Sequence, residues 1–331
     1  MPLSWENRPV LVTGAGGFIG SHLVEKLVQQ GAKVRAFVRY NSRNDVGLLR
    51  FLPGDLSRRV EIVTGDLRDQ SAVSQSMKGV THVFHLGALI AIPYSYQNPA
   101  DVIETNILGT LNVLMSARTE KVERVVHTST SEVYGTALRV PIDETHPLQG
   151  QSPYSASKIG ADKLAESFFY SFNLPVVIIR PFNTYGPRQS ARAIIPTLIT
   201  QALVGDVIKI GNTNALRDFT YVSDTVDGFI KIAEAPGIEG QTYNLGTGTE
   251  ISIGELAELT IALTDHAVKL QIDENRLRPE KSEVQRLLSD NRRALEAFGW
   301  SPQVPFPQGL LQTYEWIKQN LSMYSTGRYV V

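Results

Sequence analysis

The chain has 331 residues and a net charge of −1, with 42% hydrophobic and 20% charged residues. This composition is typical of a globular protein with one large or two modest domains, and it lacks the basic excess of proteins that bind nucleic acids or membranes. No cysteine is present, which excludes disulfides, thiolate metal sites and cysteine nucleophiles, and we expect a cytoplasmic location.

Short apolar runs alternate with longer amphipathic ones in the first half of the chain. Strands are expected at 9–13, 33–39, 60–66, 81–88, 122–130 and 174–182, where β-branched residues are frequent. Helices are expected at 18–31, 101–118 and 154–172, and Gly31 is expected to end the first of them. This alternation predicts βαβ units, and therefore an α/β fold with a doubly wound parallel sheet.

The pattern becomes irregular after about residue 190, and prolines occur at 187, 196, 236, 279, 302, 305 and 307. We therefore predict a first domain over 1–182, with returning segments near 215–246, and a smaller mixed α/β lobe that takes up most of 183–331. No apolar run reaches the ~18 residues of a membrane span, and the first residues do not resemble a signal peptide. No cluster has metal-site spacing, so we expect no metal.

Glycines follow the first strand in the sequence TGAGGFIG. Gly14, Gly17 and Gly20 allow a tight turn and close approach to a pyrophosphate, and the helix that opens at Phe18 and Ile19 supplies free N–H groups. A glycine turn without a ligand is the alternative, but its position between a strand and a helix favours dinucleotide binding.

The end of the second strand bears on which dinucleotide is bound. An acidic residue there would hold the ribose of NAD, but its expected place falls near Val38, and Arg39, Asn41 and Ser42 follow. This favours NADP, with NAD and a solvated basic loop as the alternative. Asp66 ends the third strand, where it accepts from the adenine amino group or caps the next helix.

Catalytic candidates follow the fifth strand and open a later helix. Thr130, Ser131 and Glu132 stand side by side where a buried strand should end, and carboxyl ends of such strands gather catalytic groups. Tyr154 and Lys158 are four residues apart, hence on one helix face, where the ammonium is expected to lower the pKa of the phenol. A tyrosine tuned in this way can take a proton from a sugar hydroxyl. Taken alone, each signal also fits an ordinary solvated residue or a chance pair.

Together these stretches resemble the extended short-chain dehydrogenase/reductase family, and specifically its nucleotide-sugar epimerases and dehydratases. The resemblance covers nearly the whole chain and follows the family's order in TGAGGFIGSHL, GDLRD, HLGA, TSTSEVYG, YSASK, RPFNTYGPRQ and RDFTYVSD. It implies a Rossmann domain with tightly bound NAD(P) that is regenerated in each turnover. It also implies a C-terminal lobe for a sugar nucleotide, and a homodimer formed through two long helices per subunit.

The resemblance also assigns roles to individual residues. Thr130 would hydrogen-bond the reacting sugar oxygen, Tyr154 would be the base with Lys158 as its partner, and Asn106 would orient the lysine. Further cofactor contacts are implied for Leu67, Leu86 and Ala88. Substrate contacts are implied for Ser95, Asn183, Arg192, Arg217 and Arg278, and a ribose contact for Glu283.

The pair Ser131–Glu132 resembles GDP-mannose 4,6-dehydratases and UDP-glucuronate decarboxylases, whereas simple 4-epimerases tend to have small or apolar residues there. Longer stretches, including FHLGALIAIPYSYQNPADVIETNILGTLNVL, look like the N-acetylglucosamine nucleotide 4,6-dehydratases of legionaminic-acid pathways. This resemblance implies GDP- or UDP-N-acetylglucosamine as the substrate, with the apolar segment 89–94 around its sugar. A decarboxylase using Arg188, Arg192 or Arg217, a 4-epimerase and a non-catalytic NADP sensor are the alternatives.

Overall fold

The computed structural model describes residues 3–277 and 279–324. Within these residues a seven-stranded sheet has the order β11-β6-β5-β4-β1-β2-β3, and every pairing in it is parallel. Its strands are β1 (Pro9–Thr13), β2 (Lys33–Arg39), β3 (Glu61–Gly65), β4 (His82–His85), β5 (Arg124–Thr128), β6 (Val176–Pro181) and β11 (Thr242–Leu245). The predicted doubly wound Rossmann-type sheet is confirmed.

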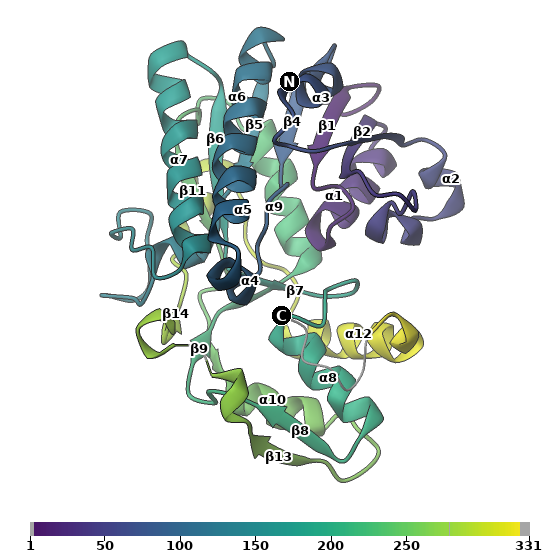
Figure 1. Cartoon of the computed structure of the whole chain (residues 1–331), viewed down its shortest axis with the longest axis vertical. Coiled ribbons are helices and arrows are strands. Elements are labelled where there is room, and N and C mark those ends of the chain that lie inside the picture. The colour runs from purple at the N-terminus through teal and green to yellow at the C-terminus, as the bar shows by residue number, and fades with distance from the viewer. Residues whose placement is uncertain (1–2, 278, 325–331) are drawn as a thin grey trace.

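Helices cover both faces of this sheet (Figure 1). One face carries α1 (Phe18–Gln29) and α9 (Val222–Glu234), and the other carries α3 (Gln70–Met77), α6 (Gly109–Thr119) and α7 (Pro153–Phe172). In β1, Val10 and Val12 pack in the core on the α1 side, whereas Leu11 packs in the core on the α6 side. Strands whose two faces are both buried, such as β1 and β6, are almost continuously apolar.

Four strands end earlier than the sequence predicts, and two of them by more than one residue. The expected strand 81–88 ends at His85, and the expected strand 122–130 ends at Thr128. The residues beyond these ends therefore form loops at the carboxyl edge of the sheet, where they are free to meet a ligand.

The helix predicted at 101–118 is divided into three parts. It consists of α5 (Pro99–Ile103), a π-helical turn at Glu104–Leu108 and α6. Turns of this type often mark functional sites because they redirect side chains that a regular helix would place elsewhere. Two further short helices precede this turn in the chain, α2 (Gly54–Ser57) and α4 (Ile92–Gln97).

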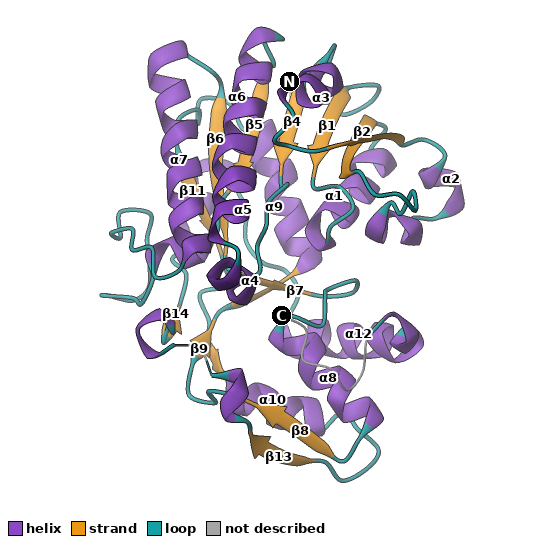
Figure 2. Cartoon of the chain, in the orientation of Figure 1, coloured by secondary structure: helices purple, strands orange, loops and turns teal. Residues whose placement is uncertain are grey.

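A second lobe lies beside the carboxyl ends of the sheet strands (Figure 2). Its paired strands are β7 (Asn183–Tyr185) with β10 (Phe219–Tyr221), β8 (Val207–Ile210) with β13 (Lys269–Ile272), and β9 (Leu216–Arg217) between β12 (Ile251–Ser252) and β14 (Arg286–Leu287). The helices of this lobe are α8 (Ile194–Val204), α10 (Ile253–Ile261) and α12 (Phe306–Gln319), whereas α11 (Arg292–Phe298) packs against β11 of the sheet. Between β10 and β12 the chain returns to the first body as α9 and β11. The domain limits at residues 182 and 183 stay a prediction.

In the described part of the chain, none of the helices is both long and apolar enough to cross a bilayer. Across the same residues, no group of three or more His, Cys, Asp or Glu side chains is placed to hold a metal ion.

Candidate active site

The end of β5 is joined to helix α7 by hydrogen bonds. The backbone carbonyl of Thr128 accepts from Lys158 Nζ at 2.5 Å, and the Thr130 hydroxyl hydrogen-bonds the side chain of Tyr154. Tyr154 and Lys158 lie one turn apart and are both buried, as the spacing predicts. The structure therefore brings together three of the predicted catalytic side chains, Thr130, Tyr154 and Lys158.

Glu132 lies close enough to Tyr154 for its charge to affect the phenol. It belongs to a 3-10 turn at Ser131–Tyr134, which begins where Thr130 Oγ1 accepts from the Glu132 backbone N–H at 3.2 Å. The charge of Glu132 raises the pKa of Tyr154, so the two groups are neighbours. Ser131 is buried whereas Glu132 is partly exposed, and the carboxylate is therefore open to a substrate.

The predicted lowering of the pKa of Tyr154 by Lys158 is not found. The pKa of Tyr154 is raised, mainly by burial, and the hydrogen bond from Thr130 acts against this rise. Burial also lowers the pKa of Lys158 to about 8, against the attraction of the Asp162 carboxylate. The protonation state of Lys158 therefore changes just above neutral pH.

Asn106 lies in the π-helical turn and is almost fully buried. Its side chain holds both backbone groups of Leu89, accepting from the N–H at 2.8 Å and donating to the carbonyl at 2.9 Å. It also donates to Ser157 Oγ at 2.9 Å. These bonds run to the neighbour of Lys158 and not to the lysine itself, so orientation of Lys158 by Asn106 is indirect in this structure.

The glycine turn leaves no room for side chains. Gly14 has a φ of +69°, and a Cβ there would lie 2.8 Å from the backbone nitrogen of Gly87. A Cβ at Gly20 would lie 2.2 Å from the Gly14 carbonyl oxygen. Gly17 precedes α1 without a side-chain cap, so the first N–H groups of the helix are open to an anion. The shape of the turn is therefore compatible with the pyrophosphate of a dinucleotide, and its contact by Gly14, Gly17 and Gly20 stays a prediction.

Substitution of Gly20 by alanine should disturb this turn. The added Cβ meets the Gly14 carbonyl oxygen, and overpacking of this type costs about 1–3 kcal/mol. We expect the unfolding midpoint to fall and cofactor binding to weaken by about tenfold or more. Thermal unfolding and cofactor titration measure these two effects. Gly54→Ala is the matched control because a Cβ there meets nothing within 4 Å. Equal behaviour of the two variants would contradict the assignment of the turn.

The end of β2 also agrees with the sequence analysis. Val38 is buried, and its Cγ1 would lie 3.5 Å from a Cβ added at Gly16. Val38 therefore faces the glycine turn, at the position where NAD-binding proteins have an acidic residue. Arg39 and Ser42 are exposed. Asn41 Oδ1 accepts two backbone N–H groups of its own loop. Arg39 and Ser42 are therefore available to a ligand, whereas Asn41 mainly shapes the loop.

Asp66 does not cap the following helix, so that alternative was wrong. Asp69 is the N-cap of α3, whereas the oxygens of Asp66 accept from the guanidinium of Arg68 at 2.7 and 3.0 Å. These bonds lower the pKa of Asp66 to about 2. Contact of Asp66 with the adenine stays a prediction. The other predicted cofactor contacts are Leu67, buried in the core, and Phe18, Ile19, Leu86 and Ala88, which are partly buried.

The predicted substrate contacts are in different environments. Ser95 is fully buried, and its hydroxyl donates to the Ile92 carbonyl at 2.7 Å, so the structure does not offer it to a substrate. Asn183 is partly exposed in β7, Arg192 is exposed, and Arg217 donates to Glu283 Oε1 at 3.4 Å. Arg278 lies outside the described residues.

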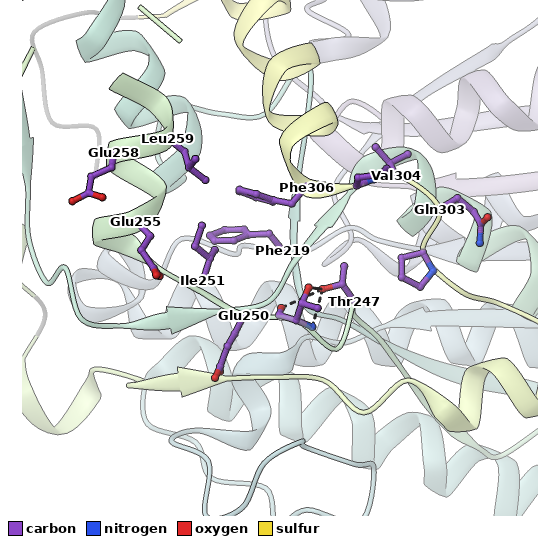
Figure 3. Close-up of a pocket in the computed structure, with 13 residues that line it drawn as sticks. Phe219, Thr247, Glu250, Ile251, Glu255, Glu258, Leu259, Gln303, Val304 and Phe306 are labelled. Carbon is purple, nitrogen blue, oxygen red and sulfur yellow. Dashed lines mark hydrogen bonds between the residues drawn. The ribbon is translucent and has the colours of Figure 1, made fainter. Parts of the chain in front are cut away.

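A cavity of about 780 Å³ occurs in the second lobe (Figure 3). Phe219, Ile251 and Phe306 form its apolar lining, and Glu250 and Glu255 stand at its side. Neither of these carboxylates is available to a ligand, because Glu250 pairs with Arg286 and Glu255 caps α10. The catalytic candidates do not line this cavity, so it is separate from the proposed site.

Asp162 is a buried carboxylate beside the site that the sequence analysis missed. It accepts hydrogen bonds from residues of β5 and β6 and influences the pKa of Lys158. The sequence did contain a signal for Asp162, which is its spacing. Asp162 is four residues after Lys158 and eight after Tyr154, and therefore lies on the same helix face.

The glycine turn and the Tyr154–Lys158 pair meet at one edge of a parallel sheet, which is the plan of the nicotinamide-dependent short-chain dehydrogenases/reductases. Within this class, the chain belongs to the GDP-mannose 4,6-dehydratase family, whose model matches residues 11–313. The recognition of a nucleotide-sugar dehydratase and epimerase family is therefore confirmed.

Individual relatives span nearly the same length. The chain is similar to a UDP-glucose 4-epimerase of Mycolicibacterium smegmatis, with 34% identity over 93% of this chain and 98% of that protein. It is 31% identical to a dTDP-glucose 4,6-dehydratase of Actinoplanes sp., over 96% and 99% of the two chains. A dTDP-glucose 4,6-dehydratase structure from Streptomyces venezuelae with NAD bound has a TM-score of 0.85 at 30% identity, covering 96% of this chain and 99% of that one. These similarities support a nicotinamide cofactor without selecting NADP.

Proposed function

We propose that this enzyme is a nucleotide-sugar 4,6-dehydratase. The observation that carries the proposal is the partly exposed carboxylate of Glu132 beside Tyr154. A 4-epimerase needs a base for the C4 hydroxyl alone, whereas a 4,6-dehydratase needs a second base for the C5 proton. Glu132 supplies that second base at the same edge of the sheet.

Each residue has a distinct part in the reaction. Thr130 hydrogen-bonds the C4 oxygen, and Tyr154 takes the C4 hydroxyl proton with the ammonium of Lys158 beside it. The nicotinamide supplies the chemistry of accepting a hydride from C4 and returning it to C6. Glu132 removes the C5 proton, which the C4 ketone has made acidic, and the C6 hydroxyl leaves as water. When the hydride returns to C6, Glu132 gives a proton back to C5. Ser131 or Glu132 protonates this leaving hydroxyl.

We further propose NADP as the preferred cofactor, because Val38 replaces the acidic residue and the cation of Arg39 is exposed next to it. Arg39→Ala should weaken NADP binding by about tenfold or more and leave NAD binding nearly unchanged, since a charge-assisted hydrogen bond to a phosphate is lost. Titration of both cofactors measures this difference. Lys33→Ala, at the other end of β2, is the control. Equal weakening of both cofactors would exclude a specific role of Arg39.

For the substrate we propose GDP- or UDP-N-acetylglucosamine, which would make the product an intermediate of legionaminic-acid synthesis. The side chain of Ile90 is 67% exposed directly after Leu89, whose backbone is fixed by Asn106. An exposed apolar side chain that follows a backbone held in this way suits the acetamido methyl of such a sugar. The diphosphate would contact Asn183 and Arg217, with Arg192 nearby.

Mass spectrometry tests the substrate and the reaction together. Purified enzyme with NADP receives GDP-N-acetylglucosamine, UDP-N-acetylglucosamine, GDP-mannose and UDP-glucuronate in separate reactions. Loss of water from an N-acetylglucosamine nucleotide is the expected result. Loss of carbon dioxide from UDP-glucuronate would indicate the decarboxylase. An isomer of unchanged mass would indicate the 4-epimerase, which the similarity to the Mycolicibacterium epimerase keeps as the second candidate.

We also propose a homodimer formed through the two long helical segments. Large apolar side chains are exposed on the first segment at Ile103, Leu108 and Met115, and on α7 at Tyr170 and Phe172. Burial of such residues against a second copy is favourable. The cytoplasmic location stays a prediction.

A further inference from the structure

Asp162 collects hydrogen bonds from two strands of the sheet under helix α7. His127 Nε2 lies 3.2 Å from Oδ1, and Ser129 Oγ donates to Oδ2 at 2.8 Å. Arg180 in β6 donates to Oδ2 through two nitrogens, at 2.9 and 3.2 Å. Asp162, His127 and Ser129 are buried, so water cannot replace these partners.

Three consecutive residues at the end of β5 are hydrogen-bonded to helix α7, and the carboxylate of Asp162 accepts one of these bonds. Thr128 is bonded to Lys158, Ser129 to Asp162, and Thr130 to Tyr154. Three consecutive residues at the end of β5 are thus bonded to three helix side chains that are spaced four residues apart on one face of α7. The bond from Ser129 to Asp162 ties down the residue between Thr128 and Thr130, and therefore helps to fix the positions of both.

Asp162 is a single buried carboxylate that is surrounded by several positively charged or titratable groups. Lys158 and Arg180 are buried cations, and both attract the Asp162 carboxylate. Burial raises the pKa of Asp162, but the hydrogen bond from His127 and the charges of Arg180 and Lys158 hold it at about 2, so the carboxylate is ionised near neutral pH. Burial keeps the pKa of His127 low, and the imidazole is neutral near pH 7. The titratable groups that face the cluster from the surrounding elements are His85, His127, Glu132, Tyr134, Tyr154 and Arg180.

We propose that Asp162 is a positioning residue that keeps Lys158 protonated and holds the end of β5 in register with the catalytic helix. The proposal rests on the catalytic role proposed above for Lys158. Without the Asp162 charge, the buried ammonium of Lys158 would lose the attraction that opposes its desolvation, and Lys158 would release its proton more readily.

The protonation of Lys158 can be measured without a substrate. Lysine labelled with a carbon isotope at Cε reports its own titration by nuclear magnetic resonance, and a Lys158→Met variant assigns the signal. In Asp162→Asn the titration midpoint of Lys158 should fall by about one pH unit or more. Asp224→Asn removes another buried carboxylate, which accepts backbone N–H groups of Gln303 and Val304, and should leave the midpoint unchanged. An unchanged midpoint in Asp162→Asn would overturn the proposal.

A second variant covers the case in which Asp162→Asn does not fold. Asp162→Ser likewise removes the charge and keeps a small polar side chain, so the midpoint of Lys158 should fall as in the first variant. An unchanged midpoint or a rise would overturn the proposal. These outcomes do not depend on the substrate, so a different reaction would leave them intact.

The activity profile then separates positioning from simple stability. If the enzyme is a dehydratase, the alkaline limb of kcat/KM in Asp162→Asn should move to lower pH, and Asp162→Glu should restore part of it. A uniform loss at all pH values, with an unshifted limb, would reduce Asp162 to a structural residue and overturn its role in catalysis.

Discussion

Glu132→Gln is expected to stop the reaction after oxidation at C4. Tyr154 and Lys158 remain in place, so the C4 proton and hydride still leave, and reduced cofactor accumulates in the enzyme. The amide cannot take the C5 proton, and the loss of a general base slows turnover by about a hundred- to ten-thousand-fold. Stopped-flow absorbance of the reduced nicotinamide and product analysis measure the two steps separately.

The control for this variant is Glu234→Gln. Glu234 is a partly buried glutamate at the end of α9, where it accepts from Trp5 Nε1 at 2.5 Å, remote from the catalytic group. It should keep normal turnover. Full activity of Glu132→Gln on a substrate that loses water would show that another group takes the C5 proton, and full activity on an epimerisation substrate would make the enzyme a 4-epimerase.

Tyr154→Phe is expected to abolish the first step. The ring still fills its buried site, but the group that takes the C4 proton is missing, so turnover should fall by about a hundred- to ten-thousand-fold. No reduced cofactor should accumulate, in contrast to Glu132→Gln. Cofactor binding and the unfolding midpoint should change little, because the packing of the ring is retained.

Tyr243→Phe removes a hydroxyl from another buried tyrosine, in β11, and serves as the matched control with expected normal activity. If Tyr154→Phe retained turnover within a few-fold of the unaltered enzyme, the proposed base would be wrong. A non-catalytic cofactor-binding protein would show no turnover with or without the substitution.

Local spacing allowed much of the site to be predicted. The Tyr154–Lys158 pair follows from the helical period, and the glycine turn from the demands of close backbone approach at Gly14 and Gly20. The carboxyl edge of a parallel sheet collects groups from several strands, so the sequence alone predicts Glu132 at the catalytic edge together with Tyr154. These features depend on neighbours in sequence or on the sheet plan.

Contacts between distant residues could not be predicted in this way. The bonds of Asp162 to Ser129 and Arg180 depend on how α7 lies on β5 and β6. The ion pair of Arg217 with Glu283 also joins distant segments. Ser95 was expected to meet substrate, but its helix turns the hydroxyl back to Ile92.

The pKa of Tyr154 was predicted in the wrong direction for a related reason. Sequence spacing showed the cation of Lys158 but not the burial of the phenol, and burial is the larger effect here. Burial is set by the whole fold, which one pair of residues does not reveal.

The most direct test of the dehydratase is turnover in deuterium oxide with the N-acetylglucosamine nucleotide, followed by mass spectrometry of the product. The account predicts loss of water together with one deuterium at C5, because Glu132 exchanges the C5 proton with solvent, while the hydride moved from C4 to C6 stays protium. A product of unchanged mass without deuterium would contradict the account and identify a 4-epimerase.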